Sequence, residues 1–160
     1  MPRRKHKKYS RPRKPYDRER ILEENILRDR YGLKNKKEIW KAEAAITRIR
    51  NLAKKLIIKP EEEKKAFINK LKIKGFSVNN ITDSLALNKE DWLKRRLQTL
   101  VFIKKLTRTP KQARQLVVHK KVAVGDRIIN IPSYQVSLEE EPKIRLNITL
   151  KTKEKKEPEI

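Results

Sequence analysis

A surplus of positive charge constrains this chain more than any other feature of its sequence. Lysine and arginine number 44 against 20 aspartate and glutamate residues, which gives a formal net charge of +24 at pH 7. Such an excess opposes compaction through self-repulsion and requires a polyanionic partner. RNA, DNA, an anionic membrane surface and a strongly acidic protein are the classes of partner that could balance it.

Enough apolar residues remain for a folded core. Leucine, isoleucine, valine and phenylalanine make up 43 of the 160 residues, which is above the roughly 20% floor below which highly charged chains stay disordered. The length favours one domain or two small ones. We therefore expect part of the chain to fold, with the remaining charge on surfaces and in tails.

The composition also excludes several kinds of site and location. With no cysteine and two histidines, the chain can form neither a disulfide nor a thiolate zinc site, and a histidine-rich metal site is excluded as well. No apolar run approaches the ~20 residues of a membrane-spanning helix. The basic N-terminus is not followed by the apolar segment of a signal peptide. We expect a cytoplasmic protein with no metal and no cofactor.

The first 16 residues form a basic arm. They contain eight lysine or arginine residues, no acid, and three prolines that break any helix. We predict an extended arm that contacts RNA, in which Tyr9 and Tyr16 can stack on bases. Its candidate contacts are Arg3, Arg4, Lys5, Lys7, Lys8, Arg11, Arg13 and Lys14.

Apolar residues at helical spacing predict a helical domain over residues 17–90. Asp17 is a candidate N-cap of the first helix, Asn35 of the second, and Pro60 suits the first turn of the third. Glycines follow the apolar stripes of the first and third helices, as they do at many helix ends. The expected helices cover residues 17–32, 35–56 and 60–75.

Residues 91–150 change from a helical to a strand-like pattern. Asn88 with Asp91 resembles a capping box that opens one helix, with apolar residues up to Val101 on one face. Thr109-Pro110 opens a second helix, to about residue 119. Residues 122–129 then predict a short hairpin, and the alternation over residues 143–150 predicts a half-buried strand. A charged tail covers residues 151–160.

Basic residues dominate the two helices of residues 91–150. Residues 92–121 contain ten lysine or arginine residues and no acid. For a single helix these would be ordinary solvated side chains, but a soluble surface usually mixes both signs, so this segment indicates nucleic-acid contact. The N-terminal turn of the second helix favours a phosphate near Arg108, Lys111 and Arg114. The candidate contacts are Arg95, Arg96, Gln98, Arg108, Thr109, Lys111, Gln112, Arg114, Gln115, His119, Lys120, Lys121, Arg127 and Tyr134.

No motif of an enzyme active site occurs in the sequence. There is no glycine-rich phosphate loop, no nucleophile elbow and no HExxH helix. The acids of residues 61–63 and 139–141 form runs that suit caps and solvated faces better than a catalytic pair. We expect no catalytic residue and no small-molecule substrate.

Several segments resemble one protein family. Residues 95–99 (RRLQT), 107–117 (TRTPKQARQLV) and 119–122 (HKKV) look like the S-four RNA-binding domain. Residues 130–136 (NIPSYQV) are similar to the segment that follows this domain in its ribosomal member. Residues 31–40 (YGLKNKKEIW) resemble the N-terminal helical region of the archaeal and eukaryotic form. The chain is thus similar, from about residue 16 to 136, to the small-subunit ribosomal protein S-four family.

The resemblance implies an α+β, mostly helical protein, in which a helical domain precedes an RNA-binding module with a helix pair and a β-hairpin. It implies a structural constituent of the small ribosomal subunit in the cytoplasm. Such a protein binds the 5′ domain of small-subunit rRNA, nucleates assembly and lies near the channel where mRNA enters. Its partners are rRNA, neighbouring ribosomal proteins and mRNA. The lack of cysteine, where many bacterial members hold zinc, fits an archaeal-type member, and Gly125-Asp126 replaces the usual Asn-Gly turn.

Two other functions compete with this interpretation. Pseudouridine synthases and some tRNA synthetases use the same domain as an accessory, so the chain could assist an RNA-modifying enzyme. Such enzymes need a further catalytic domain, whereas residues 17–90 predict only helices. A membrane-surface protein held by the basic arm is the second alternative, although the arm lacks the apolar face of an interfacial helix.

Overall fold

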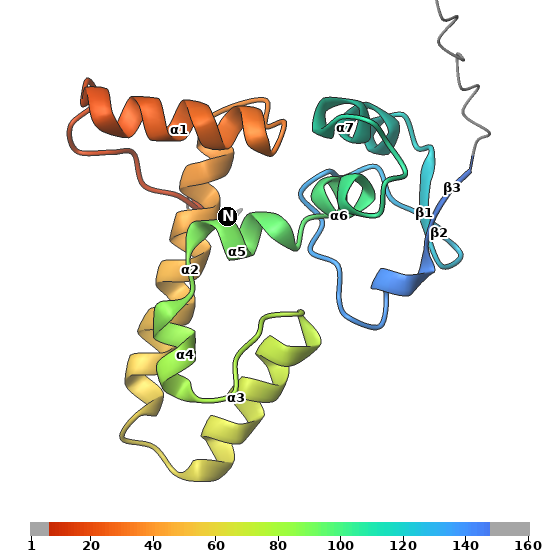
Figure 1. The fold of residues 1–160 in the computed structure, drawn as a ribbon. Coiled ribbons are helices and arrows are strands. Elements are labelled where there is room, and N and C mark those ends of the chain that lie inside the picture. The colour runs from red at the N-terminus through yellow and green to blue at the C-terminus, as the bar shows by residue number, and fades with distance from the viewer. Residues whose placement is uncertain (1–6, 148–160) are drawn as a thin grey trace, which may run out of the picture.

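The computed structural model describes residues 7–147 and has a mostly helical fold with one small antiparallel sheet (Figure 1). This confirms the predicted α+β class. Residues 1–6 of the predicted arm, residues 148–150 of the predicted last strand and the predicted tail lie outside the described residues. The elements are α1 Arg18–Arg30, α2 Lys37–Leu56, α3 Glu61–Ile73, α4 Ile81–Ala86, α5 Lys89–Lys94, α6 Leu97–Ile103, α7 Pro110–Val118, β1 Val122–Val124, β2 Arg127–Ile128, η1 Glu141–Lys143 and β3 Ile144–Leu146.

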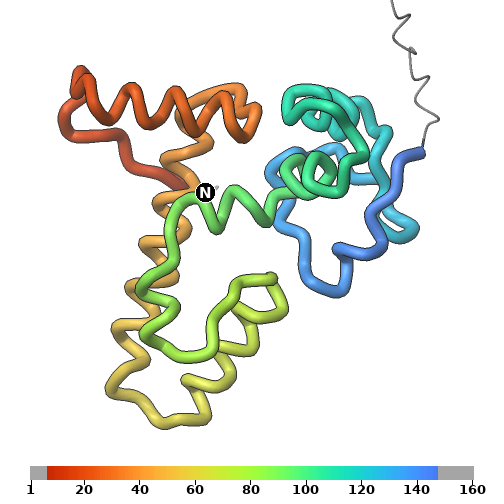
Figure 2. The backbone as a smooth tube through the Cα atoms, in the orientation of Figure 1, coloured from red at the N-terminus to blue at the C-terminus, as the bar shows by residue number. Residues whose placement is uncertain are grey.

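The long helix α2 organises the first part of the structure, the α1–α5 unit (residues 18–94). The backbone trace shows α1 across one end of α2 and α3 beside its other end (Figure 2). The predicted apolar stripe of α2 is buried from Ile39 to Ala53. One apolar cluster joins it to Leu27 of α1 and Leu93 of α5, and another joins it to Leu71 of α3. Burial of this stripe makes the predicted helices form where the sequence places them, since the N-cap residues of α1, α2 and α3 form no side-chain cap hydrogen bond.

The second part, the α6–β3 unit (residues 97–146), has a core of its own. Helices α6 and α7 pack on a sheet of order β2-β1-β3 in which both pairings are antiparallel. All three residues of the central strand β1 are buried. The predicted hairpin is confirmed, because Ala123 lies opposite Ile128 and Gly125 takes the positive φ of +59° that its turn requires. In β3, Ile144 is buried and Arg145 is exposed, as the alternation predicts.

The helix predicted after Asn88 is wrong in its extent, because it is broken into α5 and α6. Arg96 lies between them with an extended backbone (φ −74°, ψ 142°) and forms a β-bridge with Gln135. The Leu97 amide donates to the Tyr134 carbonyl at 2.8 Å. Backbone groups at the break thus bond to residues 134 and 135 instead of continuing the helix, and two short helices form in place of one.

Other element boundaries also differ from the prediction. Helix α4 was not predicted, although its Asn80–Asp83 capping box has the same spacing as the Asn88–Asp91 box of α5. Helix α2 is assigned from Lys37, but Lys36 before it already has helical dihedral angles (φ −58°, ψ −26°), so helical backbone begins directly after the predicted cap Asn35. Pro60 precedes α3 as its N-cap residue and is not part of its first turn.

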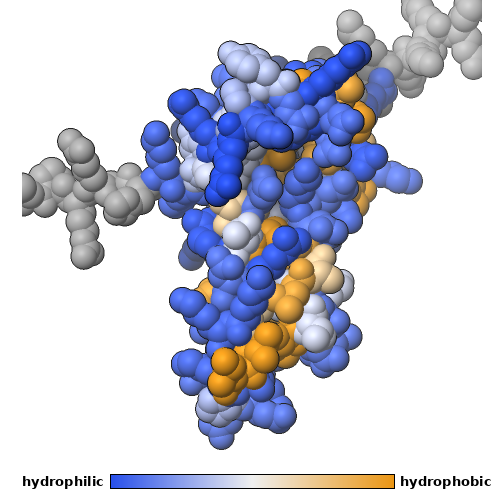
Figure 3. Space-filling view, turned by 90° about the vertical axis from the view of Figure 1, so that its left-hand side faces the viewer, coloured by the Kyte–Doolittle hydropathy of each residue, from blue (hydrophilic) through white to orange (hydrophobic). Residues whose placement is uncertain are grey.

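The surface of the α1–α5 unit is mostly hydrophilic, with an apolar patch low on the face drawn in Figure 3. Exposed apolar side chains near the end of α2 include Leu52, Ile57 and Ile58. None of the helices within residues 7–147 is both long and apolar enough to cross a membrane.

Candidate nucleic-acid interface

Helix α7 begins with a side-chain cap formed by two of the predicted contact residues. The Thr109 hydroxyl accepts a hydrogen bond from the Gln112 amide at 3.2 Å, and the Gln112 side-chain oxygen accepts one from the Arg108 amide at 3.0 Å. These two bonds satisfy backbone donors that the start of a helix leaves free. Thr109 and Gln112 therefore position α7, and any contact that they make with RNA is additional to this role.

The outer face of α7 presents a row of exposed polar side chains that we call the α7 stripe, made up of Arg108, Lys111, Gln115 and His119. Lys111 and Gln115 are four residues apart and share one side of the helix, His119 follows at its C-cap, and Arg108 directly precedes the N-cap Thr109. Lys120, Lys121 and Arg127 are exposed beyond it. Among residues 7–147, the cations of this group form no salt bridge with an acid. They are free to neutralise phosphates.

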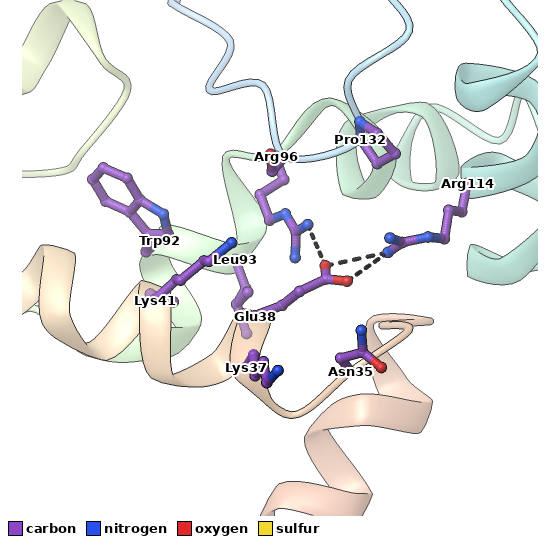
Figure 4. A pocket seen from close by; sticks show the side chains of 11 residues that line it. Asn35, Lys37, Glu38, Lys41, Trp92, Leu93, Arg96, Arg114 and Pro132 are labelled. Carbon is purple, nitrogen blue, oxygen red and sulfur yellow. Dashed lines mark hydrogen bonds and ion pairs between the residues drawn. The ribbon is translucent and has the colours of Figure 1, made fainter. Parts of the chain in front are cut away.

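Arg114, by contrast, points from α7 into a cleft between the two units, where it meets Glu38 of α2 (Figure 4). Its guanidinium lies 3.0 Å from one carboxylate oxygen of Glu38 and 3.2 Å from the other. Arg96 binds the same carboxylate from the break between α5 and α6. We call these three residues the Glu38 cluster. It ties α2 to both helices of the α6–β3 unit.

The Glu38 cluster is largely withdrawn from solvent. The side chain of Arg96 is 5% exposed, against 16% for Glu38 and 24% for Arg114. Burial by itself would raise the pKa of Glu38, but the hydrogen bonds from Arg114 and Arg96 outweigh it and hold that pKa below its usual value. Glu38 is therefore ionised at neutral pH, as two guanidinium partners require.

Gln98 forms a second polar connection between the units. Its side chain is buried, and its amide nitrogen lies 2.9 Å from the carbonyl oxygens of Tyr31 and Gly32 and 3.1 Å from that of Pro110. The backbones are in close contact there, because a Cβ on Gly32 would lie 2.8 Å from the Pro110 carbonyl carbon. The turn after α1 is thus held against the start of α7.

Arg95 and Tyr134 also have partners within the chain. Arg95 lies 2.7 Å from a Glu141 carboxylate oxygen and donates to the Val136 carbonyl at 3.0 Å. The Tyr134 hydroxyl donates to Glu140 at 2.8 Å, and this bond, with burial, raises the pKa of Tyr134. Burial of Arg96 and Gln98 does not support their predicted contact with RNA, and the partners of Arg95, Arg114 and Tyr134 compete with such a contact.

The described part of the basic arm lies against the α1–α5 unit. Arg20 of α1 donates to the carbonyls of Lys14 and Pro15 at 2.9 and 3.0 Å, and the ring of Tyr9 lies 6.1 Å from that of Trp40. Tyr9 is thereby half-buried, whereas Tyr16 is 91% exposed. The predicted contacts Lys7, Lys8, Arg11, Arg13 and Lys14 are exposed, and Arg3, Arg4 and Lys5 lie outside the described residues.

Sequence reasoning did not select the acids that organise this surface. Glu24 is buried, and burial by itself would raise its pKa. Hydrogen bonds from Trp40 and Arg20 outweigh burial and hold that pKa below its usual value. Glu38 belongs to an ordinary helical pattern, and its partners are 58 and 76 residues away in sequence. Within residues 7–147, no three histidine or acidic side chains are grouped as a metal site requires.

Comparisons with known proteins identify relatives of this chain. Residues 95–141 match the family model described as the S4 domain. Over 89% of its length the chain is similar to three archaeal proteins named small ribosomal subunit protein uS4. It is 47% identical to that of Methanococcus aeolicus, of which it covers 85%. It is 44% identical to that of Methanothermobacter thermautotrophicus and 39% identical to that of Methanospirillum hungatei, of which it covers 87% and 85%.

Proposed function

This chain belongs to the family of small ribosomal subunit proteins uS4, and from that premise we propose that it is a structural component of the small ribosomal subunit that binds the 5′ domain of small-subunit rRNA. The names of its relatives support the ribosomal role. We further propose that it nucleates assembly and lies near the channel where mRNA enters, with neighbouring ribosomal proteins and mRNA as partners.

The α7 stripe and the exposed cations around it are the observation that carries the RNA-binding proposal. These cations are exposed on and beside one helix, and none of them forms a salt bridge with a described acid. Phosphates are the natural ligands of such a surface. Side chains read the deep major groove of A-form RNA poorly, so we propose that specificity comes from RNA shape.

We propose a boundary between Lys94 and Arg95 rather than at residue 91. Trp92 and Leu93 pack with the apolar clusters of the α1–α5 unit, whereas Leu97 belongs to the core of the α6–β3 unit. The RNA-binding module then begins where the S4 domain match begins. Residues 1–16 remain a proposed arm and residues 151–160 a proposed tail.

The proposal is tested by titrating binding to the 5′ domain of small-subunit rRNA with salt, beside an unrelated RNA of equal length. With ~6–10 phosphates engaged, affinity should fall by orders of magnitude between low and moderate salt. Preference for the 5′ domain at moderate salt is the expected result. Equal binding to both RNAs at every salt concentration would refute a shape-specific rRNA-binding protein.

The double substitution Arg108→Ala with Lys111→Ala locates the surface. Sequence alone suggested adding Arg114, but that residue holds Glu38, so its loss would mix folding with binding. The double variant should bind more weakly, with an unchanged melting temperature. Its salt slope, the steepness with which the logarithm of affinity falls with the logarithm of salt concentration, should be smaller by about 1.5. Lys59→Ala is a suitable control, because the Lys59 ammonium already lies 2.9 Å from Glu63.

We also propose that the chain is not an enzyme, since its relatives are named as ribosomal proteins. An accessory role for an RNA-modifying enzyme is tested by a uridine isomerisation assay on rRNA fragments, where any turnover would contradict the proposal. A membrane-surface role is tested by co-sedimentation with anionic vesicles in the presence of competing RNA. Binding to vesicles that RNA does not displace would favour it.

A further inference from the structure

Within residues 7–147, four helices end in the same hydrogen-bonded motif. In each, an amide just beyond the helix donates to a carbonyl five residues earlier, which is the pattern of a Schellman motif. The residue before that amide takes the left-handed conformation. The four bonds run from Leu33 to Arg28 (2.8 Å), Phe76 to Leu71 (3.1 Å), Leu106 to Val101 (3.2 Å) and Lys121 to Leu116 (2.9 Å).

The left-handed residue is glycine in the α1–α5 unit and lysine in the α6–β3 unit. Gly32 and Gly75 follow α1 and α3 with φ of +58° and +79°, whereas Lys105 and Lys120 follow α6 and α7 with φ of +57° and +59°. A Cβ atom makes this conformation unfavourable, and glycine is free of that cost. The chain therefore uses the less favourable residue twice, and both times in the S4 domain.

Lack of room for a side chain explains glycine at positions 32 and 75, but it does not explain lysine at positions 105 and 120. A side chain at Gly32 would collide with the Pro110 backbone, and one at Gly75 would collide with the Arg95 guanidinium. Lys105 and Lys120 are both exposed, so either residue type fits there. Neither ammonium group makes a salt bridge or hydrogen bond with residues 7–147. Something other than packing must favour lysine.

A cation near the C-terminus of a helix also interacts favourably with the helix dipole. Helices α6 and α7 have no basic residue in their last turns, unlike α1 and α3. Yet a lysine one or two residues earlier supplies the same charge without the strain of a positive φ, as Lys104 already does at the C-cap of α6 (φ −70°). The dipole therefore explains a positive charge near these helix ends better than it explains a lysine at the strained position.

We propose that Lys105 and Lys120 contact RNA phosphates, and that the chain keeps lysine at these strained positions for that contact. Lys105 lies in the loop that leads to Arg108, and Lys120 directly follows His119, so in sequence the two flank the α7 stripe. Lys105 is a contact that the sequence did not indicate. The inference rests on the proposed rRNA binding. It adds that the two lysines lower the stability of the fold and strengthen the binding of RNA.

Replacement by glycine separates the two roles, because it removes the charge and relieves the strain together. Full-length Lys105→Gly and Lys120→Gly should melt at the wild-type temperature or up to about 4 °C higher. Each should reduce the salt slope on the 5′-domain rRNA by about 0.7–0.9 and weaken binding about five- to tenfold at 0.1 M salt. Lys105→Arg and Lys120→Arg, which keep both charge and strain, should bind as wild type does.

Glycine variants that bind RNA like wild type would overturn the inference, whatever their melting temperature. If such variants also melt at a lower temperature than wild type, the lysines stabilise their helices through the helix dipole. Wild-type preference for the 5′ domain over an unrelated RNA reports on the proposed function separately. If the wild type binds both RNAs equally, the salt slopes of the variants still decide whether these lysines contact phosphate. If the wild type binds neither RNA, both proposals fail.

Discussion

Replacing Glu38 by glutamine tests whether the Glu38 cluster holds the two units together. The substitution conserves shape but removes the charge that compensates Arg96, whose side chain is 5% exposed. Removing one partner of a buried ion pair costs about 3–5 kcal/mol. Glu38 and Arg114 retain some exposure and glutamine still accepts one hydrogen bond, so we expect a loss of about 2–3 kcal/mol, or about 4–12 °C in melting temperature.

Glu63→Gln is the matched control. Glu63 pairs with Lys59 at 2.9 Å, but both side chains are about half exposed, so its loss should cost less than about 0.5 kcal/mol. Urea and thermal unfolding of both variants, followed by circular dichroism, measure the difference. If Glu38→Gln is no more destabilising than Glu63→Gln, the cluster is a surface contact and the argument from burial is refuted.

Three further predictions concern the same contact between the units. The folded-state pKa of Glu38 is depressed, so the stability that this ionised carboxylate contributes should be present above the unfolded pKa of about 4.3 and be lost as pH falls through the folded pKa. The difference in unfolding free energy between wild type and Glu38→Gln should therefore disappear in acid. A difference that persists at the lowest pH would contradict this. Gln98→Leu leaves backbone carbonyls without a donor and should cost about 2 kcal/mol by urea unfolding, whereas an unchanged midpoint would mean that water replaces the side chain. Gly32→Ala adds a clash with Pro110 to the strain of a positive φ, so it should cost more than Gly125→Ala, where φ is nearly the same and the new Cβ would make only an ordinary 3.9 Å contact with Lys143; equal losses in thermal unfolding would show that the backbones can separate.

The sequence predicted the helices that carry long apolar stripes and the hairpin that carries a turn signal. Its charge pattern also predicted a basic surface around α7. It could not predict that several of those cations are withdrawn from the surface. The partner of Arg96 and Arg114 is an acid 58 and 76 residues earlier, and local pattern says nothing about such distant pairs.

The break between α5 and α6 has a similar origin. Helical spacing of the apolar residues continues through Arg95 and Arg96, so period alone favours one helix. The bridge to Gln135 competes with it and depends on a segment about forty residues later. Helix α4 is a different case, because the Asn80–Asp83 spacing was visible in the sequence and matched the recognised box at Asn88.

The long sequence separation within the Glu38 cluster has a consequence for the order of folding. The core of the α6–β3 unit closes within residues 97–144, whereas the bonds to Glu38 span 58 and 76 residues and close only after a large loss of chain entropy. We therefore expect the two units to dock after the core of the α6–β3 unit has formed. A contact formed after the rate-limiting step slows unfolding without speeding folding, so the Glu38 cluster lengthens the lifetime of the assembled fold, a quantity that the unfolding arm of a chevron plot measures directly.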